Sequence, residues 1–322
     1  MSAGSSTARE PGQVAEGAGH AGMTRRGLLL FAAMCVIWGI PYLFIRIAVT
    51  ELSPATLVFL RTGIAALVLV PIVLTRGGGV RPLLGRWRPL LLFAAIEVAI
   101  PWFFLSSAEQ KLSSSLTGLL ISAVPLVATV TALAFGNRDR IGLSSLAGLL
   151  IGVVGVAAIV GFDLGTANLT ALLEIGLVVV GYAVGPVILS RYLSDLPSVS
   201  VIAVSLALCT LAYAPIVAIQ RPTALPSAGV LVSMAVLAIV CTALAFLVFF
   251  ALIAEIGPVR ATVITYINPA VAALLGVAVL GESFTLGMGL GFVLVLLGSA
   301  LATGRMPRRP RLLRLQRVLK RD

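Results

Sequence analysis

Ten long apolar runs, separated by short polar connections, constrain this chain more than any other feature. An α-helix needs about 20 predominantly apolar residues to cross the hydrocarbon core of a bilayer. Only 11% of the residues are charged, whereas a soluble domain carries about a quarter. We therefore expect an all-α integral membrane protein with ten transmembrane helices. The expected spans are 27–49, 54–74, 89–108, 113–135, 142–161, 169–190, 199–219, 228–253, 259–280 and 285–303.

The second half of the chain repeats features of the first half at a nearly constant offset. Pro125, for example, lies opposite Pro269 at an offset of 144 residues. We therefore predict two five-helix repeats, residues 27–161 and 169–303. Because five is an odd number, the second repeat is expected to be inverted, as in secondary transporters whose substrate site lies near the midplane. Further pairs, at offsets of 143 to 145, are Pro41 with Pro186, Arg46 with Arg191, Asp139 with Glu282, Gly148 with Gly291, and Gly155 with Gly298.

Basic residues mark one face of the membrane. They concentrate in the connection at 76–88 and in the C-terminal tail, 304–322. The positive-inside rule then predicts that both termini are cytoplasmic, in a bacterial cytoplasmic (inner) membrane. The basic tail should contact anionic membrane lipids. Residues 1–24 are rich in small and polar residues and are expected to be a disordered tail, and translation could start at Met1 or at Met23.

Residues suited to metal, redox or nucleotide chemistry are scarce. The single histidine, His20, lies in the N-terminal tail, and the three cysteines lie far apart inside apolar runs. We interpret the cysteines as buried apolar residues rather than as a disulfide framework or a zinc site. No Walker lysine motif is present, so no cofactor or metal is expected. The excess of basic residues falls in loops and tails, which argues against a nucleic-acid partner.

The chain carries several short motifs in a fixed order, partly duplicated. They are Trp38-Gly39-Ile40-Pro41, Phe59-Leu60-Arg61, Ser113-Ser114-Ser115 through Pro125-Leu126, Gly148 to Gly155, and Gly257-Pro258-Val259-Arg260-Ala261 through Tyr266-Ile267-Asn268-Pro269 to Leu280-Gly281-Glu282. In this order, the motifs resemble the EamA-type transporters of the drug/metabolite transporter (DMT) superfamily. The resemblance implies ten helices and the transport of small metabolites, and it leaves the substrate open. One departure is Asn137-Arg138-Asp139-Arg140, where the family usually has Gly-Glu-Arg.

Two acidic residues lie within expected spans. Glu97 lies at the middle of span 89–108, where an ionised carboxylate costs about 2.5–3.5 kcal/mol on insertion scales. It is either a site for proton coupling or for a substrate amine, or a structural hydrogen bond between helices. Glu174, about one turn into span 169–190, is either a second coupling acid or a charge favoured by the helix N-terminus.

Two arginines lie toward the outer ends of the first two spans. Arg46 and Arg61 could bind an anionic group of a substrate. The structural interpretation is the stronger one, because arginines near helix ends commonly extend to the interface or pair with a nearby acid such as Glu51.

Two prolines are expected to interrupt spans 113–135 and 259–280 near their centres. A proline inside a helix frees a carbonyl and kinks the helix, and such kinks line the central cavity of transporters. Pro125 and Pro269 are therefore either cavity-lining kinks or hinges alone. Four nearby residues either line the same cavity or pack ordinarily. They are Trp38, Tyr182, Tyr266 and Asn268.

The leading hypothesis is a secondary transporter, an exporter of small metabolites such as amino acids or drug-like compounds, which works by alternating access and is proton-coupled or driven by the substrate gradient. The alternatives are a membrane-embedded enzyme acting on lipid and a non-transporting sensor. The sequence has no HExxH motif, which argues against the enzyme, and no loop long enough for the soluble domain that a sensor would need. We therefore expect that the protein is not an enzyme. Small-residue ridges in the fifth and tenth spans are interpreted as scaffold or homodimer contacts. They are Gly148, Gly152 and Gly155, and Gly287, Gly291 and Gly298.

Overall fold

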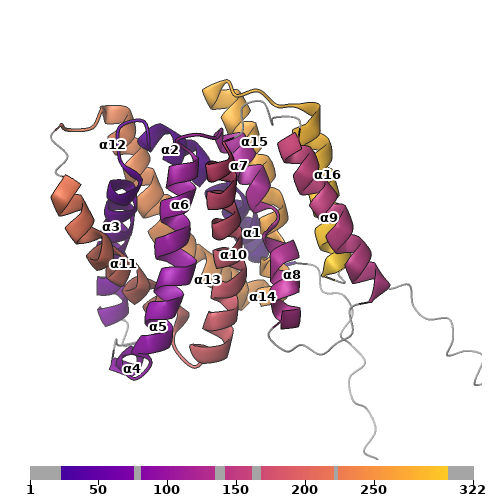
Figure 1. Cartoon of the computed structure of the whole chain (residues 1–322). Helices are drawn as coiled ribbons and strands as arrows, with labels where there is room; N and C mark the ends of the chain where they lie inside the picture. The colour runs from indigo at the N-terminus through magenta and orange to yellow at the C-terminus, as the bar shows by residue number, and fades with distance from the viewer. Residues whose placement is uncertain (1–22, 76–80, 135–141, 162–167, 221–223, 304–322) are drawn as a thin grey trace, which may run out of the picture.

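The structure is a computed structural model, and it describes residues 23–75, 81–134, 142–161, 168–220 and 224–303. The described elements are all helical (Figure 1). Those of the first half are α1 (Arg25–Ile37), α2 (Pro41–Ala48), α3 (Pro54–Thr75), α4 (Arg81–Leu84), α5 (Trp87–Phe93), the π-helix η1 (Ala94–Ala99), α6 (Ile100–Ala108), α7 (Ser114–Ile121), α8 (Val124–Ala134) and α9 (Leu143–Gly161). Those of the second half are α10 (Leu169–Tyr192), α11 (Ser198–Gln220), α12 (Ala228–Ala235), the π-helix η2 (Val236–Leu244), α13 (Ala245–Ile256), α14 (Pro258–Ala261), α15 (Ile264–Leu280) and α16 (Leu286–Ala302).

These helices confirm a multi-span membrane protein. Within the described residues, eight helical stretches are long and apolar enough to cross a membrane, and α15 and α16 add two apolar helices of 17 residues each. Seventeen residues is the short end of the range for a spanning helix. Large apolar side chains such as Leu67, Leu150 and Leu274 are more than 60% exposed. In a bilayer these side chains contact lipid.

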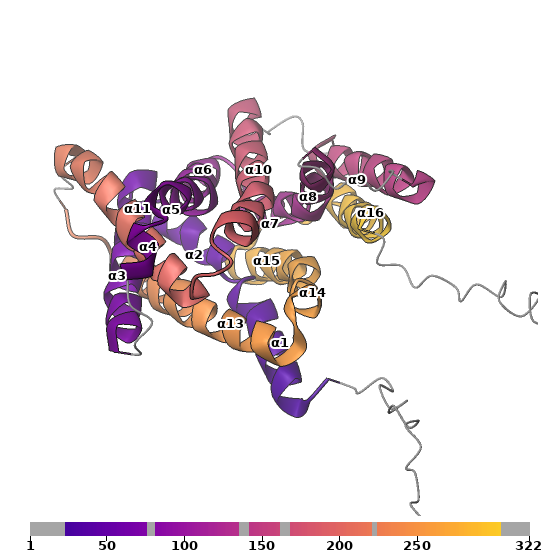
Figure 2. The ribbon, with the colours of Figure 1, turned by 90° about the horizontal axis from the view of Figure 1, so that it is seen from below.

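The helices pair across the two halves. Extensive contacts join α9 to α16, α3 to α11, α7 to α15, α6 to α10, and α1 to α13. In span order these are spans 5 with 10, 2 with 7, 4 with 9, 3 with 6, and 1 with 8. Exchanging each span with its counterpart in the other half reproduces the same set of pairs, as a two-fold relation between the repeats requires. Seen from below, α3 and α11 lie at one end of the molecule, and α9 and α16 lie at the other (Figure 2).

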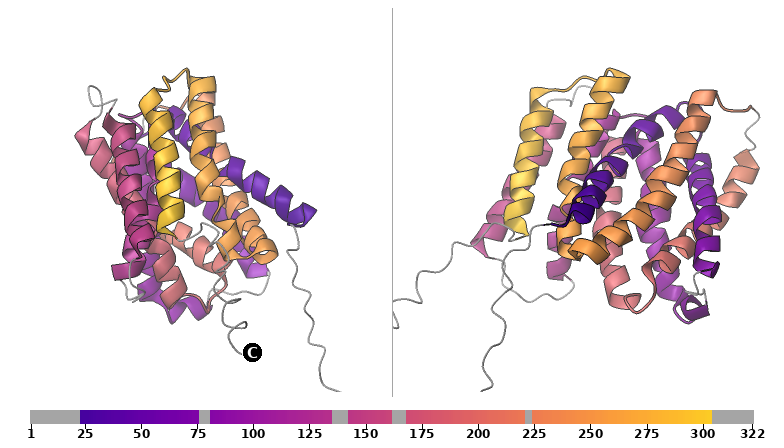
Figure 3. Two further views of the ribbon diagram at one scale, coloured as in Figure 1. Left: turned by 90° about the vertical axis from the view of Figure 1, so that its right-hand side faces the viewer. Right: turned by 180° about the vertical axis from the view of Figure 1, so that it is seen from behind.

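The pair α9 and α16 stands beside the main bundle (Figures 1 and 3) and is joined by glycine. A Cβ atom on Gly155 would lie 2.7 Å from the carbonyl oxygen of Gly291, and a Cβ on Gly148 would lie 2.6 Å from that of Gly298. Only glycine permits this close backbone approach. The two small-residue ridges therefore serve as scaffold within one chain, which is the first of the two interpretations of these ridges.

The helix breaks lie just before the prolines rather than at them. Span 1 divides at Trp38–Ile40, and Pro41 opens α2. Span 4 divides before Pro125, where Ser122 and Ala123 make i→i−3 backbone hydrogen bonds. Pro269 lies inside the continuous helix α15, so the prediction that it interrupts the span at its own position is wrong. Because proline removes the bond to the carbonyl four residues earlier, the tightened turn precedes it, at 262–266.

Spans 3 and 8 each contain a π-helical stretch, η1 and η2. The offset of 145 residues that pairs Pro41 with Pro186 also pairs Glu97 in η1 with Thr242 in η2. The widened turn in η2 is visible in the side-chain bond from Thr242 Oγ1 to the carbonyl of Leu237. Such π-segments occur frequently at functional sites, and here both repeats place one near the centre of the molecule.

Several sequence-based predictions fall outside the described residues. These concern residues 1–22, the connections at 76–80, 135–141 and 162–167, and the basic tail 304–322. At the ends of the described segments, the start of α1 and the end of α16 lie at the same face of the molecule, the lower one in Figure 1. The upper face is the one at which α6 and α15 end and α7 and α12 begin.

Candidate functional site

Arg61 is a buried cation near the middle of the bundle. Its side chain extends from α3 and keeps only 5% of its surface exposed. The guanidinium carbon lies 3.8 Å from the ring centroid of Trp102, and Nε donates a hydrogen bond of 2.9 Å to Thr242 Oγ1. A desolvated cation–π contact of this kind contributes about 2 kcal/mol. The predicted extension to the interface and the predicted pairing with Glu51 are both wrong for this residue.

The guanidinium of Arg61 has spare bonding capacity. Among the described residues, no carboxylate oxygen lies within 4 Å of it, and Nη1 and Nη2 make no hydrogen bond. A buried charge without an ionic partner is expensive. Tyr182 on α10 lies near both Arg61 and Glu97 and touches two of the hydrophobic clusters of the core. Arg61 therefore presents two free donor groups among aromatic side chains contributed by both halves.

Glu97 lies where the sequence placed it, at the centre of span 3, and is half-buried with its carboxylate oxygen Oε2 enclosed. One carboxylate oxygen, Oε2, has no hydrogen-bond partner among the described residues. The carboxylate packs directly on the backbone of α10, because a Cβ atom added to Gly185 would overlap it. Gly185 thus supplies the space that Glu97 occupies. No interhelical hydrogen bond of Glu97 is present in the described part of the chain, so the structural interpretation lacks its expected partner.

A second group of charged residues lies at the upper face. Glu174 Oε1 accepts a hydrogen bond of 2.9 Å from Ser107 Oγ and pairs with Lys111 Nζ at 3.4 Å. Arg46 donates from Nη1 to the backbone carbonyl of Glu109 rather than to Glu51. Glu51 instead accepts a bond from the backbone N–H of Ser227. Glu174 therefore links α10 to the end of span 3, across the two halves.

Glu282 makes the most extensive contact between the halves on this face. Its two oxygens accept bonds of 2.8 Å from the backbone N–H groups of Ser114 and Ser115, and the hydroxyl groups of both serines add two more bonds. Glu282 thus caps the N-terminus of α7, where a negative charge is favoured. The left-handed conformation of Gly281 (φ 66°) turns the chain back for this contact. A pocket of about 400 Å³ beside it is lined by Arg46, Ile47, Thr50, Lys111, Leu112, Ser113, Leu280 and Glu282.

The remaining candidates join α1 to the second half. Trp38 packs against Phe249 with ring centroids 4.6 Å apart and an angle of 45° between the ring planes. The side-chain amide nitrogen of Asn268 lies 3.0 Å from the carbonyl oxygens of Cys35 and Ile264. Tyr266 has a buried hydroxyl without a partner among the described residues. Trp38 and Asn268 therefore lie apart from the Arg61 group, in the contact between α1, α13 and α15.

Three important residues were not among the site residues predicted from the sequence. Glu109 is fully buried, Thr242 holds Arg61, and Glu282 caps α7. The repeat offset could have identified Thr242, since it is the counterpart of Glu97. The expectation about cysteine holds, because Cys35, Cys209 and Cys241 are buried and free. In the described part of the chain, no group of three or more His, Cys, Asp or Glu residues could hold a metal ion.

Comparison with known proteins identifies the fold. The model of the EamA-like transporter family matches the chain twice, over residues 25–161 and 169–304. The chain belongs to the EamA-like transporter family. The two matches cover the two repeats of this EamA-like protein, as the resemblance in its motifs implied.

Relatives of this EamA-like protein carry transporter names. It is 29% identical over 258 residues to the "Uncharacterized inner membrane transporter YedA" of Escherichia coli (strain K12), covering 79% of this chain and 82% of that protein. An "Uncharacterized transporter" of Archaeoglobus fulgidus is 24% identical, covering 88% and 99%. A solved crystal structure matches with a TM-score of 0.63 and 21% identity, covering 88% of this chain and 99% of the other. At that identity the structural match supports the fold alone.

Proposed function

We propose that this EamA-like protein is a secondary transporter that exports small metabolites by alternating access, and that its substrates carry an anionic group, such as a carboxylate, which binds Arg61. One observation carries the proposal: Arg61 is buried between the two halves with Nη1 and Nη2 free. A carboxylate could accept two parallel hydrogen bonds from such a fork. The aromatic rings of Trp102 and Tyr182 would contact the rest of the substrate. Amino acids and drug-like acids both fit this description.

We further propose that Glu97 couples transport to protons. Its carboxyl lies near the bilayer centre and has an unpartnered oxygen, and acids at such positions commonly form proton relays. Its proximity to Tyr182, which also neighbours Arg61, places the proton close to the substrate. A carboxyl that is protonated in one state and ionised in the other can exchange a proton for a substrate. Glu174 is held by Lys111 and Ser107, and this favours a structural role.

The proposed location is the inner membrane, with the lower face of Figure 1 toward the cytoplasm. Names of relatives support the location, and the basic connections support the orientation. The start of α1 and the end of α16 share that lower face, as cytoplasmic termini require. In this orientation the upper contacts of Glu282 and Glu174 would close the outer side, so the structure would represent a state closed toward the outside.

Replacing Arg61 tests the site. A panel of small carboxylates, each paired with its neutral amide, is presented to purified protein in proteoliposomes, and transport is measured as uptake or as substrate-induced current. We expect acids to be carried and amides to be rejected. Arg61→Gln should reduce the apparent affinity about tenfold or more, since hydrogen bonds to charged groups contribute about 1.5–3 kcal/mol. The apparent affinity of Arg61→Lys should lie between those of the wild type and Arg61→Gln, because lysine keeps the charge but lacks the planar fork.

Arg81→Gln is the matched control, because Arg81 is an exposed arginine on α4. It should leave affinity unchanged. If Arg61→Gln transports acids with wild-type affinity, or if the wild-type protein carries amides as well as acids, the anionic substrate class is refuted.

A further inference from the structure

Glu109 is a buried carboxyl that the proposed cycle does not use. It follows Ala108, the last residue of α6, and is 0% exposed. Neither Oε1 nor Oε2 has a hydrogen-bond partner among the described residues. Only its backbone is anchored: its carbonyl accepts a bond from Arg46, and its N–H donates a bond of 3.0 Å to the carbonyl of Leu105. Buried polar atoms are normally satisfied, so this side chain requires an explanation.

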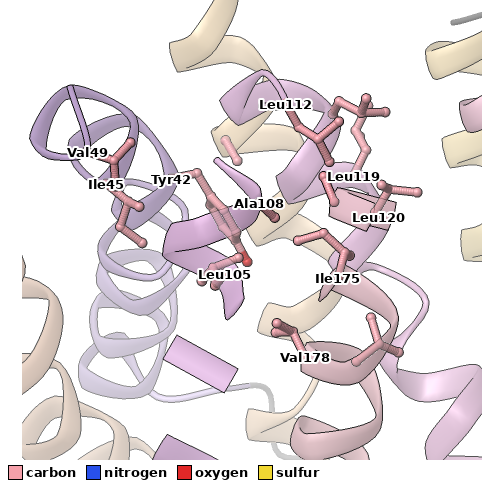
Figure 4. Close-up of a cluster of buried hydrophobic side chains, with 14 of the residues drawn as sticks. Tyr42, Ile45, Val49, Leu105, Ala108, Leu112, Leu119, Leu120, Ile175 and Val178 are labelled. Atoms are coloured by element: carbon pink, nitrogen blue, oxygen red, sulfur yellow. The ribbon is translucent and has the colours of Figure 1, made fainter. Parts of the chain in front are cut away.

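The surroundings of Glu109 disfavour its ionised form. Leu105, Ala108 and Leu112, which precede and follow it, belong to an apolar cluster in the upper half of the bundle (Figure 4). Glu109 also caps the C-terminal end of α6, where the helix dipole opposes negative charge. The titratable and charged groups that act on it are Tyr42 and Arg46 of α2, Arg61 of α3, Tyr182 of α10, and Glu282 after α15. Lys111 follows two residues later in the chain and pairs with Glu174 of α10.

Burial raises the pKa of the Glu109 carboxyl well above its usual range, and the negative charge of Glu282 raises it further, whereas Arg46 and Arg61 act in the opposite direction. A water-exposed glutamate has a pKa of about 4.3. A state in which water reaches Glu109 would therefore release its proton at a pH where the closed state holds it. The closed arrangement binds more protons than an open one.

We propose that Glu109 is a second proton-binding residue of the transport cycle, which keeps the upper side closed while protonated and favours its opening when ionised. The proposal rests on the proposed alternating-access function and adds a residue to it. The seal that would open is the upper contact set, made by Glu282 with Ser114 and Ser115 and by Glu174 with Lys111. Opening would admit water from the adjacent pocket that Arg46 and Lys111 line.

The direction and size of the pH effect follow from proton linkage. Below the pKa of the open state, Glu109 is protonated in both states and does not bias the equilibrium. As the pH rises above that value, the open state loses its proton first and is favoured. The ratio of open to closed protein then increases by at most about tenfold per pH unit, until the closed state also ionises.

Native Cys241 provides a reporter, because it adjoins Thr242 beside Arg61 and is buried. Cys35→Ala and Cys209→Ala leave it as the only thiol. Right-side-out membrane vesicles, in which the upper face would be outside, receive a membrane-impermeant sulfonated methanethiosulfonate at pH 6, 7 and 8. At each pH, the labelling rate of the protein that retains Glu109 is divided by the labelling rate of the Glu109→Gln variant. This division removes the intrinsic pH dependence of the thiol reaction.

We expect this ratio to rise at least about threefold from pH 6 to pH 8, within the linkage limit above. Glu109→Asp, which retains a titratable carboxyl, should preserve the rise. A ratio that is flat with pH, or the absence of any labelling from this side, would overturn the proposal. Transport is assayed in the same vesicles: a pH-dependent ratio without transport would instead refute the proposed function.

Discussion

The carboxylate of Glu97 occupies space that a glycine of the neighbouring helix leaves free. Glu97 lies against Gly185 on α10, and any side chain at position 185 would occupy the same volume. Tyr182 lies one turn earlier on the same helix and also neighbours Arg61. Gly185 is therefore a positioning residue for Glu97, acting through packing alone.

Gly185→Ala should displace Glu97 and weaken pH-driven transport, while leaving the protein folded. An overpacked core typically loses about 1–3 kcal/mol. Gly176→Ala on the same helix is the control, because a Cβ atom there meets no other atom within 4 Å. It should be neutral, or stabilising by up to about 1 kcal/mol. Proteoliposome transport under a pH gradient and thermal unfolding in detergent provide the two measurements. Equal transport by the two variants would show that Gly185 does not position Glu97.

Individual residues also show where sequence reasoning reached its limit. The depth of Glu97 was predictable, because it lies near the middle of an apolar run. The burial of Arg61 was not predictable, since it depends on Trp102 of span 3 and Thr242 of span 8, the latter 181 residues away. Glu109 lies at the end of a helix, where a charge is ordinarily solvated, and only tertiary packing buries it.

At the scale of elements, glycine determines how closely helices approach. The contact between α9 and α16 brings backbone against backbone, so no side-chain movement could accommodate a larger residue. The spans, the glycine ridges and the repeat were readable from apolar length and from spacing. The helix breaks were displaced from the prolines because the lost hydrogen bond is four residues earlier, and neighbouring helices determine which turn tightens.

Gly155→Ala should separate α9 from α16. Its Cβ would lie 2.7 Å from both the carbonyl oxygen of Gly291 and the backbone nitrogen of Val295. We expect a loss of stability of about 1–3 kcal/mol, measured as a lower unfolding temperature in detergent. Gly161→Ala, at the open end of the same helix, serves as control and should not lower it. An unchanged unfolding temperature for Gly155→Ala would contradict the close packing of this pair.

For the whole molecule, the pairing of each span with a helix of the other half places the charged residues at the interfaces between repeats. Arg61 contacts Thr242, Glu97 packs on α10, and Glu282 caps α7. Motion of one repeat against the other would therefore break and remake these contacts. The central claim is that such motion carries a substrate past Arg61 in exchange for a proton on Glu97.

Transport under an imposed pH gradient tests this claim most directly. Proteoliposomes containing wild-type protein or Glu97→Gln are loaded with a carboxylate that the wild-type protein carries, and its movement is followed with and without the gradient. Glu97→Gln keeps the size of the side chain and removes the titratable proton. We predict that the variant inserts normally, loses pH-driven transport and retains exchange of substrate for substrate. Transport by Glu97→Gln with an unchanged pH profile would contradict the account.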